Sequence, residues 1–367
     1  MKRVKDLFPS LISDENIVKA IEEVNRTHRS RKGRLNKTVI WVEATLPDRI
    51  KELRQIILDG YEQSPAIKRR RYDHSAGKWR VIAEPKLYPD QYIHHMVIQV
   101  LQPVMMRGMD FWCCGSIRGR GTSRGMRGIK NWMHKDTKYT KYAAELDIYH
   151  FYDSIQPEVV MDRMRELIKD EKMLDVIYSL VKDGIMIGAY FSQWFANTLL
   201  QPMDNMIRQQ LHIKHYVRYM DNITIFSNNK KLLHKAVRAI NAWLNGVHLR
   251  LKDNWQVYRT KSRMVTGLGY RYSKDKVLLR KKNLLKIKRS ISNLRSRLSQ
   301  NRSISFKQAS GLISRIGMLN HCECRNIRRR LLQSNLIYSL KNIIKNSSSA
   351  EHRRKLNNLI TGGGQFC

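Results

Sequence analysis

Acidic residues are scarce in this sequence, and their scarcity is its strongest compositional feature. The 367 residues include 31 aspartates and glutamates against 69 lysines and arginines, a formal net charge of +38 at pH 7. This excess is larger than solubility requires and indicates a polyanionic partner. The basic residues run from Lys2 to Lys355 and are interleaved with apolar residues, whereas membrane attachment favours one concentrated basic face. We therefore expect the partner to be nucleic acid and not a membrane.

Long apolar runs are also missing. The longest apolar region, MVIQVLQPVMM at 96–106, is short and is interrupted by glutamines and a proline, so we do not expect it to cross a bilayer. The stretch MKRVKDLFPS at 1–10 has no apolar segment of the kind that secretory signals carry. These two absences predict a soluble, intracellular protein.

Cysteines are few and unevenly placed. There are five, and Cys113 and Cys114 are adjacent, which does not suit a disulfide framework in a chain of this length. We expect reduced thiols, as in a cytoplasmic protein. The segment HCEC at 321–324 has metal-binding side chains, but no second cluster completes a tetrahedral zinc site at the usual spacing.

No linker rich in proline, glycine or serine divides the chain, and no repeat of fixed period is visible. The length predicts one continuous body of two or three packed subdomains. Residues 1 to about 75 are predicted as polar helices and turns that end in the basic cluster KRRR at 68–71. GKWRVIAEP at 77–85 predicts a short strand, and SQWFANTLLQPMDNMIRQQL predicts a helix with an irregularity at Pro202.

From residue 276 onward the composition is that of basic helices. Asn283 is the predicted N-cap of a helix whose apolar residues recur three and four positions apart. Ser305 and Gln308 predict a capping box at the start of the next helix. A helical C-terminal subdomain is the natural interpretation.

Two aspartates stand out because each is embedded in apolar strand residues. In AAELDIYHFYDSI, the two-residue alternation of a strand places Leu146 and Ile148 on one face and Asp147 on the other. HIKHYVRY and NITIFS read as two strands that meet at Met220 and Asp221 with hairpin-like spacing.

Two such carboxylates brought together would repel each other unless a cation neutralised them. If Asp147 and Asp221 converge, two divalent ions about 3.5–4 Å apart would activate an attacking hydroxyl and neutralise a transferring phosphoryl group. Oxygen ligands favour Mg²⁺, with Mn²⁺ as the alternative ion. The competing interpretation is that Asp221 is a turn-forming residue, since Asp and Asn are common in hairpin turns.

The glycine-rich segment GSIRGRGTSRG at 115–125 is a further candidate. It lacks the GxxxxGK[ST] pattern of a nucleotide-binding P-loop. Its backbone amides, together with Arg118 and Arg120, could hold a phosphate in another geometry, or the segment could be a surface turn.

The order of these segments resembles that of reverse transcriptases. GKWRVIAEP, GRGTSRG, LDIYHFYDSI, IGAYFSQWFAN, YMDN and GLGY follow one another between about residues 65 and 275. YMDN is similar to the family's YxDD signature, LDIYHFYDSI to its first palm motif, and GLGY to its hairpin between palm and thumb. The resemblance implies an α+β right-hand polymerase with fingers, a palm of antiparallel sheet packed on helices, and a helical thumb. Residues 1–110 would form the N-terminal region and fingers, 111–275 the fingers and palm with the catalytic motifs, and 276–367 a basic thumb.

The resemblance also implies roles for individual residues. Asp147 and Asp221 would be metal ligands, joined by the backbone carbonyl of Ile148. Tyr152 matches the position whose ring crowds a ribose 2′-hydroxyl and so favours deoxynucleotides; its alternative is an ordinary core aromatic.

Arg80 matches a finger arginine that contacts the incoming triphosphate or the template. Lys68, Arg69 and Arg70 could share that task, and the alternative for each is an ordinary surface cation.

Gln193 matches the start of the helix under the nascent base pair, where its amide could hydrogen-bond a sugar or a base edge. Its alternative is a polar residue at a helix start. Lys286 and Arg289, in the predicted thumb, are expected to contact nucleic acid.

One departure from the family pattern occurs at residue 222, where asparagine replaces the second aspartate of the signature. An amide keeps one coordinating oxygen but loses a full negative charge, so Asn222 should weaken metal binding while Asp147 and Asp221 remain the core ligands. Asn222 is retained in the catalytic set. The expected function is RNA-directed DNA polymerase, and the alternative is a polymerase-derived RNA-binding scaffold.

Within the family, RYMDNITIF and LKDNWQVYRTKSRMVTGLGYRYSKDKVLLRKK look closest to prokaryotic enzymes of diversity-generating retroelements and of related defence-associated groups. This implies synthesis of complementary DNA from a structured noncoding RNA, with deoxynucleoside triphosphates, in a prokaryotic cytoplasm. An accessory protein or a second polymerase subunit is a further implied partner. No ribonuclease H, endonuclease or integrase module is visible, so RNA removal and DNA insertion would fall to other factors.

Overall fold

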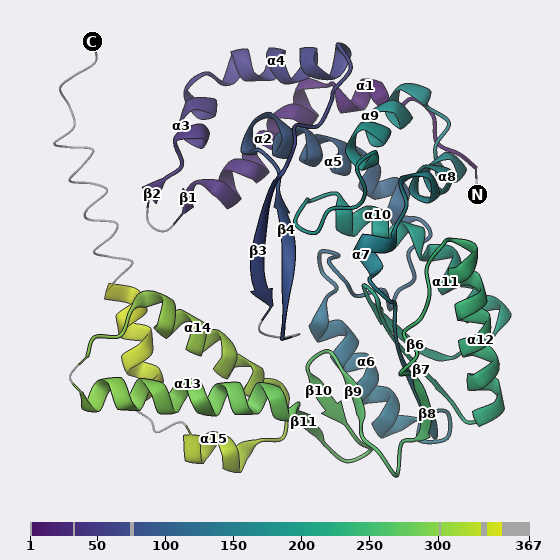
Figure 1. Cartoon of the computed structure of the whole chain (residues 1–367), viewed down its shortest axis with the longest axis vertical. Coiled ribbons are helices and arrows are strands. Elements are labelled where there is room, and N and C mark those ends of the chain that lie inside the picture. Colours follow the sequence, from purple (N-terminus) through teal and green to yellow (C-terminus); the bar gives the residue numbers. More distant parts are fainter. Residues whose placement is uncertain (1, 32–33, 74–76, 301, 332–335, 347–367) are drawn as a thin grey trace. The chain divides into compact units, whose positions relative to one another are not determined.

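The computed structural model describes residues 2–31, 34–73, 77–300, 302–331 and 336–346 (Figure 1). Two compact units make up the chain, Met1–Ser262 and Arg263–Cys367. The division into regions ending at residues 110, 275 and 367 remains a prediction.

Helices dominate the first part of unit Met1–Ser262. The second helix shows why they form: Ser13 caps its first turn by accepting a hydrogen bond from the Asn16 amide at 3.3 Å, and its apolar residues Ile17, Ile21 and Val24 are buried. That helix packs against the fourth and fifth helices. The bounds are α1 Phe8–Leu11, α2 Asp14–His28, α3 Lys37–Ala44, α4 Leu46–Leu58 and α5 Tyr92–Met106. Within the described parts of the chain, no helix has both the length and the apolar composition that crossing a membrane requires.

A long hairpin interrupts this helical region. Strands β3 (Ile67–Asp73) and β4 (Lys78–Glu84) pair antiparallel, with Ile67 opposite Glu84 and Arg71 opposite Arg80. The strand predicted at 77–85 is therefore confirmed. Turns are predicted for the cluster KRRR, but this is wrong, because these residues form β3. Basic side chains with long apolar stems are accommodated on a two-stranded ribbon that is open to solvent. The shorter strands β1 (Ser30–Arg31) and β2 (Arg34–Leu35) form a separate hairpin.

A four-stranded antiparallel sheet belongs to the same unit (Figure 1). Its strands are β5 (Tyr142–Asp147), β6 (His215–Tyr219), β7 (Asn222–Ser227) and β8 (Gln256–Arg259), in the order β6-β7-β5-β8. Helix α12 (Lys230–Gly246) packs against β5, β7 and β8, and α6 (Thr122–Lys135) packs against β6. The predicted alternation in β5 is confirmed, since Leu146 and Ile148 are buried and the side chain of Asp147 is only partly exposed.

The remaining helices of this unit lie between β5 and β6 in the sequence. They are α7 Phe151–Ser154, α8 Pro157–Leu167, α9 Glu171–Val181, α10 Ser192–Leu199 and α11 Gln201–Asn205. The irregularity predicted at Pro202 is confirmed, because α10 ends at Leu199 and α11 begins two residues later. One continuous apolar core, from Leu11 to Leu251 in the sequence, joins these helices to the sheet. This core fixes the sheet's position beneath the candidate site.

Unit Arg263–Cys367 has its own sheet and helices. Strands β9 (Val265–Gly267), β10 (Tyr270–Tyr272) and β11 (Val277–Leu279) pair in the order β11-β10-β9. The helices are α13 Lys281–Ser299, α14 Phe306–Gly317 and α15 Arg325–Leu331. The capping box of Ser305 and Gln308 is confirmed. Asn283 is not an N-cap, because α13 already begins at Lys281, and its side-chain amide instead donates to the carbonyl of Gly269 at 3.2 Å.

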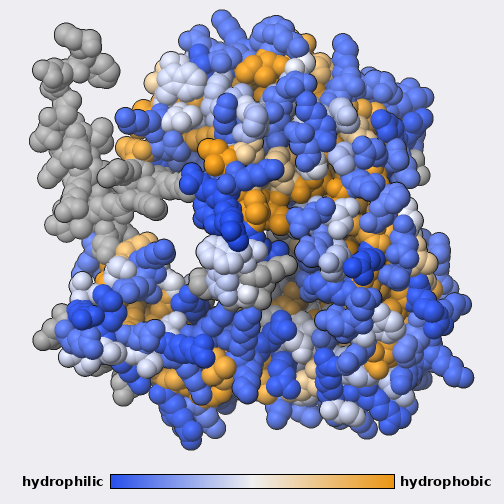
Figure 2. All heavy atoms as spheres, viewed as in Figure 1, coloured by the Kyte–Doolittle hydropathy of each residue, from blue (hydrophilic) through white to orange (hydrophobic). Residues whose placement is uncertain are grey.

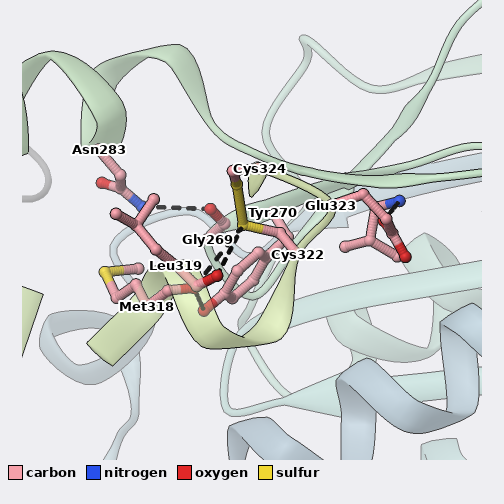
Figure 3. Close-up of a disulfide and its surroundings, with 9 residues drawn as sticks. Gly269, Tyr270, Asn283, Met318, Leu319, Cys322, Glu323 and Cys324 are labelled. Carbon is pink, nitrogen blue, oxygen red and sulfur yellow. Dashed lines mark hydrogen bonds between the residues drawn. A yellow bond between two sulfur atoms is a disulfide. The ribbon is translucent and has the colours of Figure 1, made fainter. Parts of the chain in front are cut away.

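Cys322 and Cys324 form a disulfide in this unit (Figure 3). The expectation of reduced thiols is therefore wrong for this pair, and it holds for the two free, buried cysteines at 113 and 114. The residue between the paired cysteines, Glu323, donates its amide to the Val277 carbonyl at 2.8 Å. The Cys-Glu-Cys segment is thus hydrogen-bonded to β11. The fifth cysteine, at 367, lies outside the described residues.

Candidate active site

The register of the central sheet brings the two aspartates together. Asp147, the last residue of β5, lies opposite Asn222, the first residue of β7. One step further, the amide of Ile148 donates to the carbonyl of Asp221 at 3.2 Å. Neighbouring strands of a sheet lie about 4.8 Å apart, so the two carboxylates emerge at the same edge. Segments separated by more than seventy residues in the sequence meet at this point.

A two-residue turn presents Asp221. Tyr219 and Asn222 are the last paired residues of β6 and β7, and Met220 adopts a left-handed backbone conformation with φ of 56°. The loop before α6 approaches this turn so closely that a Cβ atom on Gly115 would lie 2.7 Å from the backbone nitrogen of Met220. Only glycine fits there. The glycine-rich segment thus has a packing function at its first residue.

The two carboxylates are electrostatically coupled. Burial, followed by the nearby Asp147 carboxylate, raises the pKa of Asp221 above its ordinary value. Asn222 Nδ2 donates a hydrogen bond to Asp221 Oδ1 at 2.9 Å and so favours the ionised form. Lys252 forms an ion pair with Asp147 Oδ1, and its amide donates to the Asp147 carbonyl at 2.9 Å. The site therefore holds two carboxylates against one lysine.

These groups fit a divalent cation. Asp147 Oδ1 is shielded from solvent and accepts no hydrogen bond of normal geometry from the described residues, although the Lys252 ammonium lies beside it. The Lys252 ammonium therefore occupies the position at which a metal cation would meet Asp147 Oδ1. Within the described ranges, no group of three His, Cys, Asp or Glu residues is placed to hold a metal, and this site itself has two such residues. The oxygen ligands on offer are the carboxylates of Asp147 and Asp221, the Ile148 carbonyl and the Asn222 amide, a hard set that suits Mg²⁺ or Mn²⁺.

Tyr152 lies in the electrostatic field of this pair. It belongs to α7, which follows β5 directly, and its ring is partly buried against the core. Burial, followed by the charge of Asp221 and the nearby Tyr219, raises the pKa of Tyr152, and Arg80 opposes that rise. Arg80, Tyr219 and Asp221 are thus each near enough to Tyr152 to affect its ionisation.

The β3–β4 register separates the four basic residues predicted on the fingers. Directly paired residues of an antiparallel ribbon point to the same face, and neighbours along a strand alternate. Arg69 therefore shares the face of Arg80, whereas Lys68 and Arg70 lie on the opposite face. Arg69 also forms an ion pair with Glu84 at 2.7 Å. Arg69 can therefore act with Arg80 on the incoming triphosphate or the template. Lys68 and Arg70 point to the other face and cannot share that contact.

The other predicted residues are placed as follows. Gln193 is exposed in the first turn of α10, and Arg118 is exposed in the glycine-rich segment. Arg120 directs a terminal nitrogen to the carbonyl of Asp110 at 2.5 Å, so part of its donor capacity holds the loop's own backbone. Lys286 and Arg289 lie on α13 in the second unit, the former partly buried and the latter exposed.

A buried ion pair lies next to the turn at Met220 and Asp221, and the sequence patterns did not predict it. Arg218 and Asp204 are both fully buried, and the guanidinium meets the carboxylate through two nitrogens, at 2.8 and 2.7 Å. Arg218 also donates to Asn197 Oδ1 at 2.9 Å and to the Met220 carbonyl at 3.2 Å. Burial acts to lower the pKa of the Arg218 guanidinium, but Asp204 outweighs it and holds that pKa well above its ordinary value.

This network ties α10 and α11 to the turn that carries Asp221. Arg218 could have been singled out in the sequence because it is a charged residue inside the otherwise uncharged strand segment HYVRY. Its partner Asp204 lies on a helix with no pattern that marks it. For Lys252, the signal was the alternation in HLRLK, which buries Leu249 and Leu251 and points the intervening side chains away from the core.

Comparison with known proteins adds a family-level result. A family model described as reverse transcriptase (RNA-dependent DNA polymerase) matches residues 67–272, more than half of the chain. No curated protein matches the sequence.

Similar solved structures include two telomerases. The apo telomerase from Candida tropicalis, truncated from its C-terminal domain, is 15% identical with a TM-score of 0.44, over 61% of this chain and 58% of that one. The telomerase from Candida albicans in complex with a TWJ fragment of telomeric RNA is 14% identical with a TM-score of 0.46, over 73% of this chain and 58% of that one. The chain thus spans less than two thirds of the length of these structures.

Proposed function

Because the chain belongs to the reverse transcriptase family, and has that family's right-hand polymerase fold of helices and antiparallel sheets, we propose that it is an RNA-directed DNA polymerase that makes complementary DNA from a structured noncoding RNA. The observation that carries the proposal is the pairing of β5 with β7, which sets Asp147 opposite Asn222 and beside Asp221. A carboxylate pair of this kind can hold the two metal ions that activate a hydroxyl and neutralise a transferring phosphoryl group in nucleotidyl transfer.

In the proposed reaction, a primer hydroxyl attacks the α-phosphate of a deoxynucleoside triphosphate, and pyrophosphate leaves. Asp147 and Asp221, with the Ile148 carbonyl, would hold two divalent ions, which supply Lewis-acid activation of the hydroxyl and neutralise charge on the phosphoryl group. Asn222 keeps Asp221 oriented through the hydrogen bond from its amide. Its neutral side chain leaves the site with one carboxylate fewer than the family pattern.

The remaining site residues would position the nucleotide. Arg80 would contact the triphosphate and Tyr152 would exclude a 2′-hydroxyl, roles supported by the electrostatic effect that both Arg80 and Asp221 have on Tyr152. Gln193 would contact the nascent base pair. Arg118 and Arg120, with Lys286 and Arg289, would bind the nucleic-acid backbone, for which the net charge of +38 is a general support.

The test is primer extension by the purified chain on a primed RNA template, with Mg²⁺ and either deoxynucleotides or ribonucleotides. We expect DNA product from deoxynucleotides and its loss in Asp147→Ala. Equal product from that variant would reject the site, and a preference for ribonucleotides would reject the role of Tyr152. A Tyr152→Ala variant should accept ribonucleotides more readily than the parent.

A second function, an RNA-binding scaffold, is favoured by Asn222 alone. A scaffold should bind RNA tightly but extend no primer in the presence of either Mg²⁺ or Mn²⁺. Asp147→Ala should then bind RNA as tightly as the parent. The same preparation therefore separates the two functions.

The biological role we propose is antiphage defence or retroelement diversification in a prokaryotic cytoplasm, with an accessory protein or second polymerase subunit as partner. A neighbouring variable-protein gene with a template repeat would support diversification. Growth of phage on cells with and without the gene tests defence directly.

A further inference from the structure

The β3–β4 hairpin has two faces of different chemistry. One face carries Ile67, Arg69, Arg71, Arg80, Ile82 and Glu84, with ion pairs from Arg69 and Arg71 to Glu84. The other, which we term the aromatic face, carries the side chains of Lys68, Arg70, Tyr72, Trp79 and Val81. Figure 2 shows that strongly hydrophilic side chains gather over this hairpin.

Large apolar side chains on the aromatic face are exposed to an unusual degree. Trp79 is 59% exposed, Val81 53% and Tyr72 43%. A single exposed tryptophan is ordinary, but here three such side chains are adjacent, because Tyr72 pairs with Trp79 and Val81 pairs with Arg70. The two aromatic rings lie edge to face with centroids 5.4 Å apart, and the 59% exposure of Trp79 leaves much of its indole in contact with solvent.

The charge beside these rings identifies the kind of partner. The guanidinium of Arg70 lies 5.6 Å from the centre of the Trp79 ring, and Lys68 is exposed further along the same strand. Among the described side chains of the hairpin, the carboxylate of Glu84 is on the opposite face and is already engaged by two arginines. The aromatic face therefore combines exposed rings with cations that no acid on that face neutralises.

We propose that the aromatic face binds a single-stranded stretch of nucleic acid by stacking an unpaired base on Trp79, while Arg70 and Lys68 contact the flanking phosphates. Exposed aromatic rings between cations are how proteins hold single strands without reading sequence, since every base has a stacking surface. A duplex offers no unpaired base to these rings. The inference rests on the proposed action of the chain on nucleic acid, but not on its catalysis, because Arg80, the hairpin residue assigned to the nucleotide, is on the other face.

The test measures equilibrium binding of a fluorescent single strand of about 12 nucleotides, beside an abasic strand of equal length, in the absence of nucleotides. In Trp79→Ala, the affinity for the base-bearing strand should fall about 5- to 150-fold, the equivalent of ~1–3 kcal/mol of stacking. Affinity for the abasic strand should stay unchanged. Trp79→Phe should retain most of the binding, and the matched control Tyr178→Ala, which removes an exposed aromatic on α9, should retain all of it.

Salt dependence separates stacking from charge. Trp79→Ala should leave the slope of log affinity against log salt unchanged, whereas Arg70→Ala or Lys68→Ala should reduce its magnitude by about one. The proposal would be overturned if Trp79→Ala lost affinity for the base-bearing and abasic strands equally, or lost affinity for neither. It would also be overturned by a chain that self-associates through this face, with Trp79→Ala becoming monomeric and keeping full affinity for the single strand.

Failure of this inference is distinguishable from failure of the proposed function. If Trp79 stacks a base but no DNA is made on any template, the single-strand-binding proposal is supported and the polymerase proposal is rejected. If DNA is made at the parent rate by Trp79→Ala and its single-strand affinity is also intact, the polymerase proposal is supported and the single-strand-binding proposal is rejected.

Discussion

The carboxylate of Asp204 and the carboxylates of Asp147 and Asp221 are connected to the same hairpin turn, but their charges are balanced in opposite ways. Asp204 is fully buried, meets Arg218 through two hydrogen bonds and accepts a third from the Tyr216 hydroxyl. Asp147 and Asp221 are partly exposed and repel each other, with the Lys252 ammonium and the Asn222 amide as neighbours. The charge of Asp204 is balanced by Arg218, whereas the two charges of Asp147 and Asp221 have one lysine beside them.

This difference teaches how a structural acid is told from a candidate metal ligand. A buried ion pair with every donor used contributes rigidity, and removal of one partner leaves an uncompensated charge. Two carboxylates that share one lysine keep unused coordinating oxygens and gain stability when a cation arrives. The Asp204 network holds the turn through the Met220 carbonyl, so this charge-balanced pair supports the site of the two partly exposed aspartates.

The largest expected effect is on catalysis. Asp147→Asn or Asp221→Asn should reduce DNA synthesis by at least about 10³-fold, because either change removes a charged ligand from the proposed metal site. For Asp221→Asn the unfolding free energy should stay equal or rise, since the repulsion between the carboxylates is relieved and Asp147 keeps its ion pair with Lys252. Primer extension and urea denaturation measure the two quantities. The matched control is Asp253→Asn, whose side chain is 97% exposed, and a comparable loss of activity in that variant would contradict the assignment.

The next largest effect is on stability. Arg218→Met should lower the unfolding free energy by about 3–5 kcal/mol, because it leaves Asp204 buried without its counter-charge. The control Arg165→Met, which breaks an exposed ion pair with Asp162, should cost no more than about 1 kcal/mol. Urea denaturation of both variants provides the comparison. Replacing both partners, Arg218→Met with Asp204→Leu, should recover much of the loss, and a cost for Arg218→Met as small as that of the control would refute the distinction between the clusters.

A smaller effect sharpens the role of residue 222. Asn222→Asp exchanges a hydrogen-bond donor to Asp221 for a third negative charge, so the metal-free protein should lose stability, by roughly 1 kcal/mol or less at this exposed position. The same change should increase the stabilisation produced by Mg²⁺. Thermal unfolding with and without Mg²⁺ gives both values. Asn228→Asp, just after β7, is the control, and an identical Mg²⁺ response in the two variants would count against metal binding at residue 222.

The smallest effect is a pH dependence of the metal-free protein. The folded-state pKa of Asp221 is raised above 3.8, so the folded state binds more protons and stability falls as the pH rises from about 4 through the raised pKa. Asp221→Asn should lack this fall. Asp136 has the opposite sign: hydrogen bonds from Lys214 lead the causes that lower its pKa to about 2, so its contribution is present above pH 3.8 and is lost as the pH falls towards 2. Urea denaturation across this range should show opposite slopes for Asp221→Asn and Asp136→Asn, each relative to the parent.

Local pattern predicts those parts of the fold in which backbone and burial act alone. The alternation around Asp147, the hairpin at Met220 and Asp221, the break near Pro202 and the capping box at Ser305 are confirmed for this reason. The family and its fold were also accessible, because the order of the motifs depends on sequence alone.

Features that depend on contacts with distant parts of the chain could not be predicted from the sequence. The KRRR cluster is a strand because β4 pairs with it, and Asn283 is not a cap because Gly269 offers it a carbonyl. The Arg218–Asp204 pair and the lysine at 252 join segments that no local period connects. The roles of the site residues remain predictions for the same reason, since they depend on nucleotide and template groups outside the chain.

Cleavage by bound Fe²⁺ tests the central claim most directly, because Fe²⁺ occupies Mg²⁺ sites and, with ascorbate and peroxide, cuts the backbone next to it. We predict cuts close to residues 147 and 221 that excess Mg²⁺ suppresses and that the double variant Asp147→Asn/Asp221→Asn abolishes. Cuts that persist unchanged in the double variant, or that centre on Asp204, would contradict the assignment of the two aspartates as the metal ligands.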